Sequence, residues 1–269
     1  MKKFLIPFII VVLFIILLQL YVLNEQNRCL ESGGAWIKDI CLKKDTPEKE
    51  LKKLGLIEDE KSKKAEIHVT YTYKVLEYPE IFEDLKIKVE DAKKDNGFDE
   101  IDNDFREGSP AWQLNVDMNN FTQAGNLASI LGYVFSFTGG AHPNHSFFSV
   151  NFNTESQEQF GFSDLFMDQK NALKSISEYS VDDILKQKKE KLVDENTDKD
   201  WIMEGAGPNE KNFQIFTIVP HGHLKIKALR FVFPPYSVGP YYEGTYEVEV
   251  PSKIFYEQLV EKYKADFIN

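Results

Sequence analysis

The chain has 269 residues, of which 42% are hydrophobic and 28% charged, and it contains 21 Phe and 12 Tyr. This composition is that of a folded protein, and the many aromatic rings favour β-sheet. The formal net charge of -11 argues against nucleic-acid binding, because contacts with phosphate need clustered Lys and Arg. The excess acid either favours a basic partner or only keeps an exported domain soluble.

The first predicted element is a membrane-spanning helix over residues 4–23. This apolar run, FLIPFIIVVLFIILLQLYVL, is long enough to cross a bilayer, and no small-x-small cleavage site follows it. The preceding Lys2 and Lys3 should stay cytoplasmic. We therefore expect residues 1–3 to be a cytoplasmic stub and the helix to be an uncleaved, single-pass anchor in the cell membrane. Cleaved or not, it places everything after Asn24 in the periplasm or outside the cell.

Residues 24–64 are expected to form a cysteine-closed module and a charged linker. Cys29 and Cys41 are the only cysteines, and disulfides persist in exported segments. A disulfide between them would close a short loop and contribute on the order of 3 kcal/mol. A redox or metal pair is disfavoured because Cys-x-x-Cys spacing is absent. Residues 43–64 are highly charged, which is typical of a solvated linker or a short exposed helix.

From Ala65 the pattern becomes that of a folded body. Apolar and polar residues alternate up to Val75, which predicts a half-buried strand. A helix is expected from Pro79 to Ala92, where apolar residues recur at helical spacing behind a proline. After an acidic loop, strand-like runs are found at residues 112–118, 127–137 and 146–152.

The remaining chain shows a helical region and then more strands. Phe162 opens the helical region, which ends in a charge-rich segment. An expected helix begins at Lys253, and before it the strand patterns return at residues 213–219, 224–233 and 245–250. Strands and helices are thus grouped rather than alternating, which favours an α+β fold with antiparallel sheets.

Two histidine pairs lie in predicted loops. His142 and His145 flank Pro143 and Asn144, and His221 and His223 lie in Pro-His-Gly-His. If the loops converged, zinc could use three or four imidazoles, and a metal-dependent hydrolase of cell-wall polymer is the enzyme alternative. The spacing matches no helix-borne zinc pattern, so we expect no metal site. Because the sequence also lacks a Gly-x-Ser-x-Gly elbow and a phosphate-binding loop, we expect no catalytic residue and no cofactor.

The richest local motif is residues 231–244, FVFPPYSVGPYYEG. It combines three prolines, two glycines and three tyrosines after a predicted strand, which makes a stiff loop. Exposed tyrosines are good binding groups because they cover a large area with few rotors to immobilise. A tight corner that packs its tyrosines onto the sheet remains an equal alternative.

Together these loops resemble the RsiV-like and PdaC-like envelope domain family. The resemblance covers residues 65–259 and is weaker in its first half. Four motifs carry it in chain order: TGGAHPN at 138–144, FSDLF at 162–166, NFQIF at 212–216 and FPPYSVGPYYEG at 233–244, which precedes Val250-Pro251.

The resemblance implies two small α+β domains, residues 65–152 and 153–269, that act as a binding module outside the membrane. In this family the exported region of the anti-sigma factor captures lysozyme, and prolines and tyrosines of such loops reach its substrate cleft. The partner expected here is a lysozyme-like protein or a peptidoglycan glycan. The implied binding residues are His142, Pro143, Asn144, Pro235, Tyr236, Pro240 and Tyr241.

Two departures from the family limit this inference. Only residues 1–3 precede the predicted anchor, so we do not expect direct inhibition of a sigma factor. The acidic partner motif of the deacetylase is absent beside His142, so we do not expect deacetylation.

Overall fold

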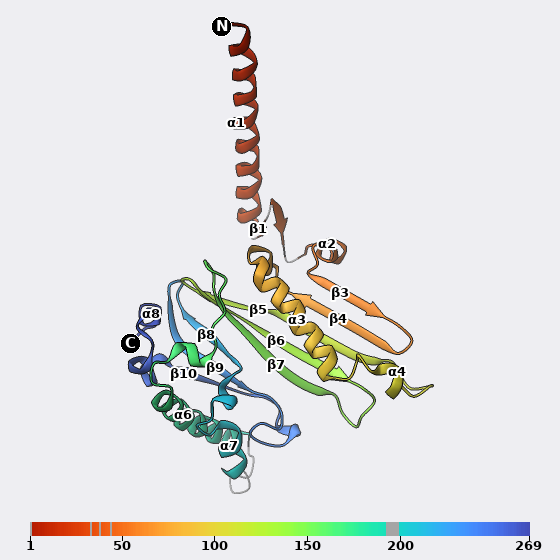
Figure 1. The fold of residues 1–269 in the computed structure, drawn as a ribbon, viewed down its shortest axis with the longest axis vertical. Helices are drawn as coiled ribbons and strands as arrows, with labels where there is room; N and C mark the ends of the chain where they lie inside the picture. Colours follow the sequence, from red (N-terminus) through yellow and green to blue (C-terminus); the bar gives the residue numbers. More distant parts are fainter. Residues whose placement is uncertain (1, 33, 38, 44, 192–198) are drawn as a thin grey trace.

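The computed structural model describes residues 2–32, 34–37, 39–43, 45–191 and 199–269, and the side chains of residues 1–10, 103 and 104 lie outside this description. Helix α1 (Lys2–Glu31) projects away from the body, and β1 (Ala35–Ile37) and β2 (Ile40–Leu42) form a hairpin beside its end (Figure 1). The predicted disulfide is confirmed, with 2.04 Å between the sulfurs of Cys29 and Cys41. It fixes the hairpin to the helix.

The N-terminal helix tests the predicted anchor only in part. In the part of the chain that is described, no helix combines the length and the apolar character that crossing a bilayer requires. The predicted span at residues 4–23 begins among residues whose side chains are not described. The membrane anchor therefore stays a prediction.

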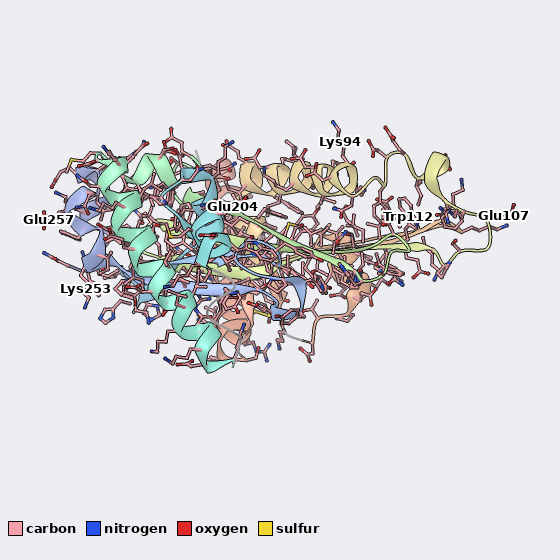
Figure 2. The ribbon with its side chains drawn as sticks, turned by 90° about the horizontal axis from the view of Figure 1, so that it is seen from below. Lys94, Glu107, Trp112, Glu204, Lys253 and Glu257 are labelled. Atoms are coloured by element: carbon pink, nitrogen blue, oxygen red, sulfur yellow. A yellow bond between two sulfur atoms is a disulfide. The ribbon has the colours of Figure 1, made fainter. Side chains whose placement is uncertain are left out.

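A five-stranded sheet forms the larger layer of the body, in the order β3-β4-β5-β6-β7. The strands are β3 (Ile57–Lys61), β4 (Ala65–Tyr71), β5 (Trp112–Ala124), β6 (Leu127–Phe137) and β7 (Asn144–Asn153). Helix α3 (Pro79–Asp95) buries its apolar stripe against one face, with Ile81 and Leu85 fully covered. Figure 2 shows the sheet nearly edge-on, with Lys94 of α3 to one side of the layer that holds Trp112.

A three-stranded antiparallel sheet forms the second layer, in the order β10-β9-β8. Its strands are β8 (Phe216–His221), β9 (Lys225–Phe233) and β10 (Tyr246–Pro251), and its helices include α5 (Phe162–Leu165), α6 (Gln169–Glu190) and α7 (Lys199–Ala206). The rings of Phe213, Phe231 and Phe233 meet edge-on in its core, which is a separate hydrophobic cluster from that under α3. The α+β fold class is therefore confirmed.

The two sheets are joined by side chains that cap the outer edge of β8. The backbone N–H of Phe216 donates to Ser149 Oγ at 3.1 Å, and its carbonyl accepts from Asn151 Nδ2 at 3.1 Å. The N–H of Ile218 donates to Ser129 Oγ at 3.0 Å, and its carbonyl accepts from Thr122 Oγ1 at 3.3 Å. Polar side chains on the face of one sheet thus satisfy the edge of the other, which fixes their relative position.

Three expectations need correction. The larger sheet is mixed rather than antiparallel, because β4 and β5 run parallel. The charged segment before residue 65 contains the short exposed helix expected as one alternative, α2 (Glu48–Lys53), but also the edge strand β3, which neither alternative predicted. The helix expected from Lys253 is replaced by 3-10 turns and the short α8 (Glu261–Lys264). A domain boundary near residue 153 stays a prediction.

Candidate binding surface

The structure brings together the two loops that the sequence singled out. The loop between β6 and β7 carries His142, and the loop after β9 carries Tyr236 and Tyr241. The His142 ring stacks on Tyr241 with centroids 4.0 Å apart and planes 24° apart. The Tyr236 hydroxyl lies 3.2 Å from His142 Nε2, at hydrogen-bond distance. Segments about 95 residues apart in sequence therefore form one surface.

The stack continues onto the strands behind the loops. The His145 ring lies nearly parallel to Tyr241 and to Tyr133, with centroids 5.9 and 5.7 Å away. Tyr133 Oη and His145 Nδ1 are 2.5 Å apart, and burial raises the pKa of the Tyr133 phenol. The result is a ring ladder, defined here as Tyr133, His145, Tyr241 and His142, that runs from the sheet to the surface. Rings held this way need little ordering when a partner binds.

The tyrosine loop is anchored from below by a buried ion pair. Glu243 Oε2 accepts from Lys188 Nζ of α6 at 2.6 Å and from the Tyr246 hydroxyl at 2.7 Å. The side chains of Lys188 and Glu243 are 0% and 1% exposed. Val238, in the middle of the loop, is buried in the core of the smaller sheet. The sequence placed Lys188 in a charge-rich segment, and nothing in its pattern indicated this burial.

Helix α7 supports the same loop from one side. Trp201 Nε1 donates to the Tyr236 carbonyl at 2.9 Å. A Cβ on Gly205 would lie only 1.8 Å from the Ser237 carbonyl oxygen, so this contact requires glycine. Tyr236 itself has a φ of 71°, a conformation that is rare outside glycine and that persists only where the surroundings hold it. The backbone at Tyr236 is therefore held in place on two sides.

These anchors leave the outer rings accessible. Tyr236 and Tyr242 are 52% and 79% exposed, while Tyr241 is half-buried in the ladder. A cavity of about 380 Å³ opens beside the ladder, lined by Tyr133, His145, Pro235, Tyr241, Tyr242, Gly244 and Thr245. Its lining contains no Asp, Glu, Lys or Arg. Rings and a concave uncharged wall suit a ligand with apolar or planar groups.

Of the predicted residues, His142, Tyr236 and Tyr241 form the centre of this surface, and Pro235 lines the cavity. The Pro143 carbonyl accepts from His142 Nδ1 at 2.8 Å, and Asn144 begins β7 as an exposed residue. Pro240 starts the short turn at Tyr241. Sequence reasoning missed Tyr133 and Tyr242. Tyr133 lies on the same face of the sheet as His145, which strand alternation could have indicated once β6 was paired with β7.

The second histidine pair lies elsewhere, so the convergence required by the enzyme alternative is wrong. His223 is at the β8–β9 turn, where its carbonyl accepts from the N–H of Gly125 in the turn between β5 and β6. His142 follows the other end of β6, and a strand of this length spans about 35 Å. Within the described ranges, no three metal-ligating side chains of His, Cys, Asp or Glu come together.

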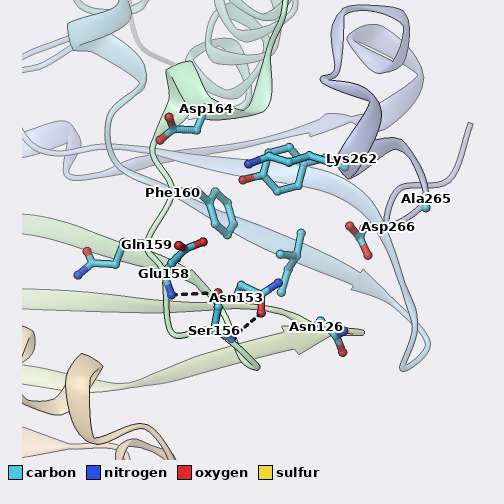
Figure 3. A pocket seen from close by; sticks show the side chains of 12 residues that line it. Asn126, Asn153, Ser156, Glu158, Gln159, Phe160, Asp164, Lys262, Ala265 and Asp266 are labelled. Atoms are coloured by element: carbon cyan, nitrogen blue, oxygen red, sulfur yellow. Dashed lines mark hydrogen bonds between the residues drawn. The ribbon is translucent and has the colours of Figure 1, made fainter.

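A larger and more polar recess lies at that opposite end of the β6–β7 hairpin (Figure 3). It measures about 460 Å³ and is lined mainly by amides and charged groups: Asn126, Leu127, Asn153, Ser156, Glu158, Gln159, Phe160, Asp164, Lys262, Tyr263, Ala265 and Asp266. Several of these groups bond to the protein itself. Asn153 Oδ1 accepts from two backbone N–H groups, of Glu155 and Ser156, and Asp164 Oδ2 accepts from that of Gly161. Burial raises the pKa of Asp266, against the opposing effect of Lys225.

Comparison with known proteins adds family and fold. Residues 163–253 match a family described as "Protein of unknown function (DUF3298)". No curated protein matches the chain. The match spans α6, β8, β9 and the tyrosine loop at residues 234–244. It includes both residues of the buried ion pair, Lys188 and Glu243.

Two solved structures are similar to this chain. A DUF3298 family protein from Pseudomonas aeruginosa PAO1 is 13% identical with a TM-score of 0.53, and the alignment covers 77% of this chain and 93% of that one. A DUF3298 family member from Bacteroides fragilis is 14% identical with a TM-score of 0.44, covering 77% and 92%. At such identity the likeness to the Pseudomonas protein shows the fold alone. The chain thus shares that fold, and its residues 163–253 match the DUF3298 domain family, whose function is unknown.

Proposed function

We propose that this chain is a membrane-anchored, envelope-exposed binding protein that docks a lysozyme-like protein through the 138–145 and 234–242 loops. The observation that carries the proposal is the contact between these loops. The His142 ring stacks on Tyr241 and lies within hydrogen-bond distance of the Tyr236 hydroxyl. The surface is held from below by a buried ion pair, while Tyr236 and Tyr242 remain exposed. Such a preformed surface binds without first paying the full entropy of ordering its loops.

The charge of the chain supports a basic protein as the partner. The formal net charge is -11, and the cavity beside the ring ladder is lined by no Lys or Arg. An acidic receptor attracts a basic protein at long range and raises the rate of encounter. The resemblance to the RsiV-like and PdaC-like family supports the same partner class. A peptidoglycan glycan is the competing ligand, since flat rings also suit sugars.

The location rests on the N-terminal sequence and the disulfide. The apolar residues 4–23 behind Lys2 and Lys3 support a single-pass anchor with the body outside the cytoplasm. The Cys29–Cys41 bond is consistent with an oxidising compartment.

The proposal is tested by titrating the full chain, held in detergent micelles, with a basic lysozyme and separately with soluble peptidoglycan fragments. A fragment that starts at residue 65 is unsuitable, because it would lack β3 and the buried Leu56. We expect lysozyme to bind. The single variants Tyr236→Ala and Tyr241→Ala should each weaken binding at least about tenfold, as substitutions of hot-spot tyrosines do.

The matched control is Tyr73→Ala, which removes a tyrosine that is 41% exposed but lies in the 3-10 turn Tyr73–Glu77, outside both loops. It should leave the affinity unchanged. Binding of the glycan alone with the same tyrosine dependence would reassign the ligand. Binding of neither, by a chain that unfolds cooperatively, would refute the proposed function.

A further inference from the structure

Four sheet edges end the two sheets, and three of them carry protection against pairing with another chain. Edge strand β3 reads Ile-Glu-Asp-Glu-Lys, and β10 alternates Glu247 and Glu249 with its buried residues. Charges of this kind disfavour the approach of another strand. The outer edge of β8 is covered by the serine, threonine and asparagine side chains described above. Strand β7 is the fourth edge.

Strand β7 lacks these devices. Residues 141–153, AHPNHSFFSVNFN, contain no Asp, Glu, Lys or Arg, and β7 pairs with β6 in uninterrupted register from Asn144 to Asn153. The strand has neither a bulge nor an internal proline. An uncharged, regular edge is a template for an additional strand.

The alternation of the strand identifies which backbone groups face outward. The Asn151 carbonyl accepts from Phe160 N–H, and the Asn153 N–H donates to the Glu158 carbonyl, so odd-numbered residues point their N–H and C=O groups away from β6. By the same alternation, the N–H and C=O groups of His145, Phe147 and Ser149 also point away from β6. In the described part of the chain, the backbone groups of these three residues have no backbone hydrogen-bond partner.

The chain itself shows that this edge accepts a strand. Residues 158–160 lie along the edge at its far end, where Gln159 bridges Phe152 in antiparallel fashion, and then turn away at Gly161. The open part continues from that short pairing towards the ring ladder, where the His145 ring contacts Tyr241. Figure 1 shows β7 as the border of its sheet on this side. The edge and the ring surface are therefore contiguous.

We propose that β7 residues 144–149 accept an extended main-chain segment of a partner protein as a sixth strand, beside the rings that hold the partner's side chains. This inference rests on the proposed function and adds a docking mode to it. Backbone pairing with His145, Phe147 and Ser149 supplies up to six hydrogen bonds, and the rings of the ladder supply selectivity.

A second copy of this chain fits the edge less well than a different protein. Two copies each carry a formal net charge of -11 and repel one another. Antiparallel pairing of two identical edges also needs a two-fold axis normal to the sheet. In Figure 1 the long axis of α1 lies roughly in the plane of the sheet. A two-fold axis normal to the sheet would therefore point the α1 of the second copy in the opposite direction. Two such helices could not enter one membrane from the same side.

Amide hydrogen exchange on the full chain in micelles tests the edge first without a partner. The amides of His145, Phe147 and Ser149 should exchange at least about 100-fold faster than those of Phe148 and Val150, which bond to β6. Equal protection of both sets at a concentration where the chain sediments as a monomer would overturn the proposal, because the edge would already be covered.

Addition of the basic lysozyme then tests the docking mode. We expect the three odd amides to slow by more than about tenfold while the even amides stay unchanged. If lysozyme binds with the dependence on Tyr236 and Tyr241 but the odd amides keep exchanging fast, the strand proposal fails and the proposed function stands. If lysozyme does not bind, the probe becomes a synthetic peptide of about ten alternating Thr and Val residues with a Lys at each end. Protection of the odd amides by this peptide would support the edge site, and its absence would overturn it.

A pair of variants separates the backbone from the side chain. Phe147→Ala and Phe147→Pro both remove the ring whose centroid lies 5.3 Å from that of Tyr133. Only proline also removes the backbone N–H that points away from β6. Proline should weaken binding of the effective probe at least about tenfold more than alanine. Equal affinities of the two variants, with the even amides of β7 still protected in both, would contradict the proposal.

Discussion

The two recesses at opposite ends of the β6–β7 hairpin differ in how their linings are held. The larger, polar recess has amides and carboxylates that already bond to the protein's own loops, as Asn153 and Asp164 do. The smaller recess is lined by rings of the ladder. The charges that hold its tyrosine loop in place, Lys188 and Glu243, are buried beneath that loop. Cavity volume therefore does not decide between the two recesses. The recess beside the ring ladder differs in that its rings are held by buried groups while Tyr242 stays exposed.

The largest expected effect comes from breaking the anchor beneath the rings. Lys188→Met leaves the Glu243 carboxylate buried without its cation, which should lower the free energy of unfolding by about 3–5 kcal/mol. Denaturant unfolding of the full chain measures this. The double variant Lys188→Met with Glu243→Leu should recover most of the loss, because it removes both charges. A single variant as stable as the parent would show that the ion pair does not support the loop.

The next effect tests the close approach of α7 to the tyrosine loop. Gly205→Ala places a Cβ against the Ser237 carbonyl, so the loop must shift, at a cost of about 1–3 kcal/mol. Gly140→Ala in the opposing loop is the matched control, since its Cβ would meet nothing nearer than the His142 carbonyl at 3.9 Å. That variant should stay within about 0.5 kcal/mol of the parent in thermal unfolding. Equal losses would mean that both loops are held alike.

A smaller effect is expected for the coupling of the rings. A double-mutant cycle of His142→Ala and Tyr241→Ala should give an interaction free energy of about 0.5–1.5 kcal/mol in unfolding, from the stack at 4.0 Å. The same cycle on Tyr256 with His142 should give zero, because these residues share no contact. Additivity within error for His142 and Tyr241 would show that the loops meet without stabilising one another.

The smallest effect belongs to the polar recess. Burial raises the pKa of Asp266, so its charged form destabilises the folded chain at neutral pH. As pH falls through the raised folded-state pKa towards the ordinary carboxyl value, the folded state takes up the proton first and this penalty disappears. Asp266→Asn should therefore stabilise the chain at pH 7 and have less effect near pH 4. Urea unfolding at both pH values measures it, and a pH-independent difference would contradict the assignment to charge.

The elements that the sequence predicted well are those with a strong local pattern. The helix from Pro79 was expected because apolar residues recur at helical spacing, and Ile81, Leu85, Val89 and Ala92 are all buried in α3. The strands expected at residues 127–137 and 146–152 are also confirmed, as β6 and as most of β7. Period and turn chemistry are local properties, so one sequence suffices to identify them.

The C-terminal segment shows where the same reasoning fails. Phe255, Leu259, Tyr263 and Phe267 recur every four residues, which is helical spacing, and all four are buried. Yet the chain forms separate short turns there, and Leu259 and Phe267 bridge to Phe166 and Ile226 instead. Spacing by four is compatible with a helix that buries one face. It is equally compatible with separate short turns that each place one side chain into a neighbouring core.

By itself the sequence determined the α+β class, the disulfide and the two loops rich in rings and prolines, because each depends on neighbours along the chain. Only the tertiary structure decided that His142 meets Tyr236 and Tyr241, that Lys188 is buried beneath them, and that the edge of β7 stays open. Each of these facts depends on how segments distant in the chain pack together. Contacts between residues far apart in the chain leave no periodic trace in the sequence.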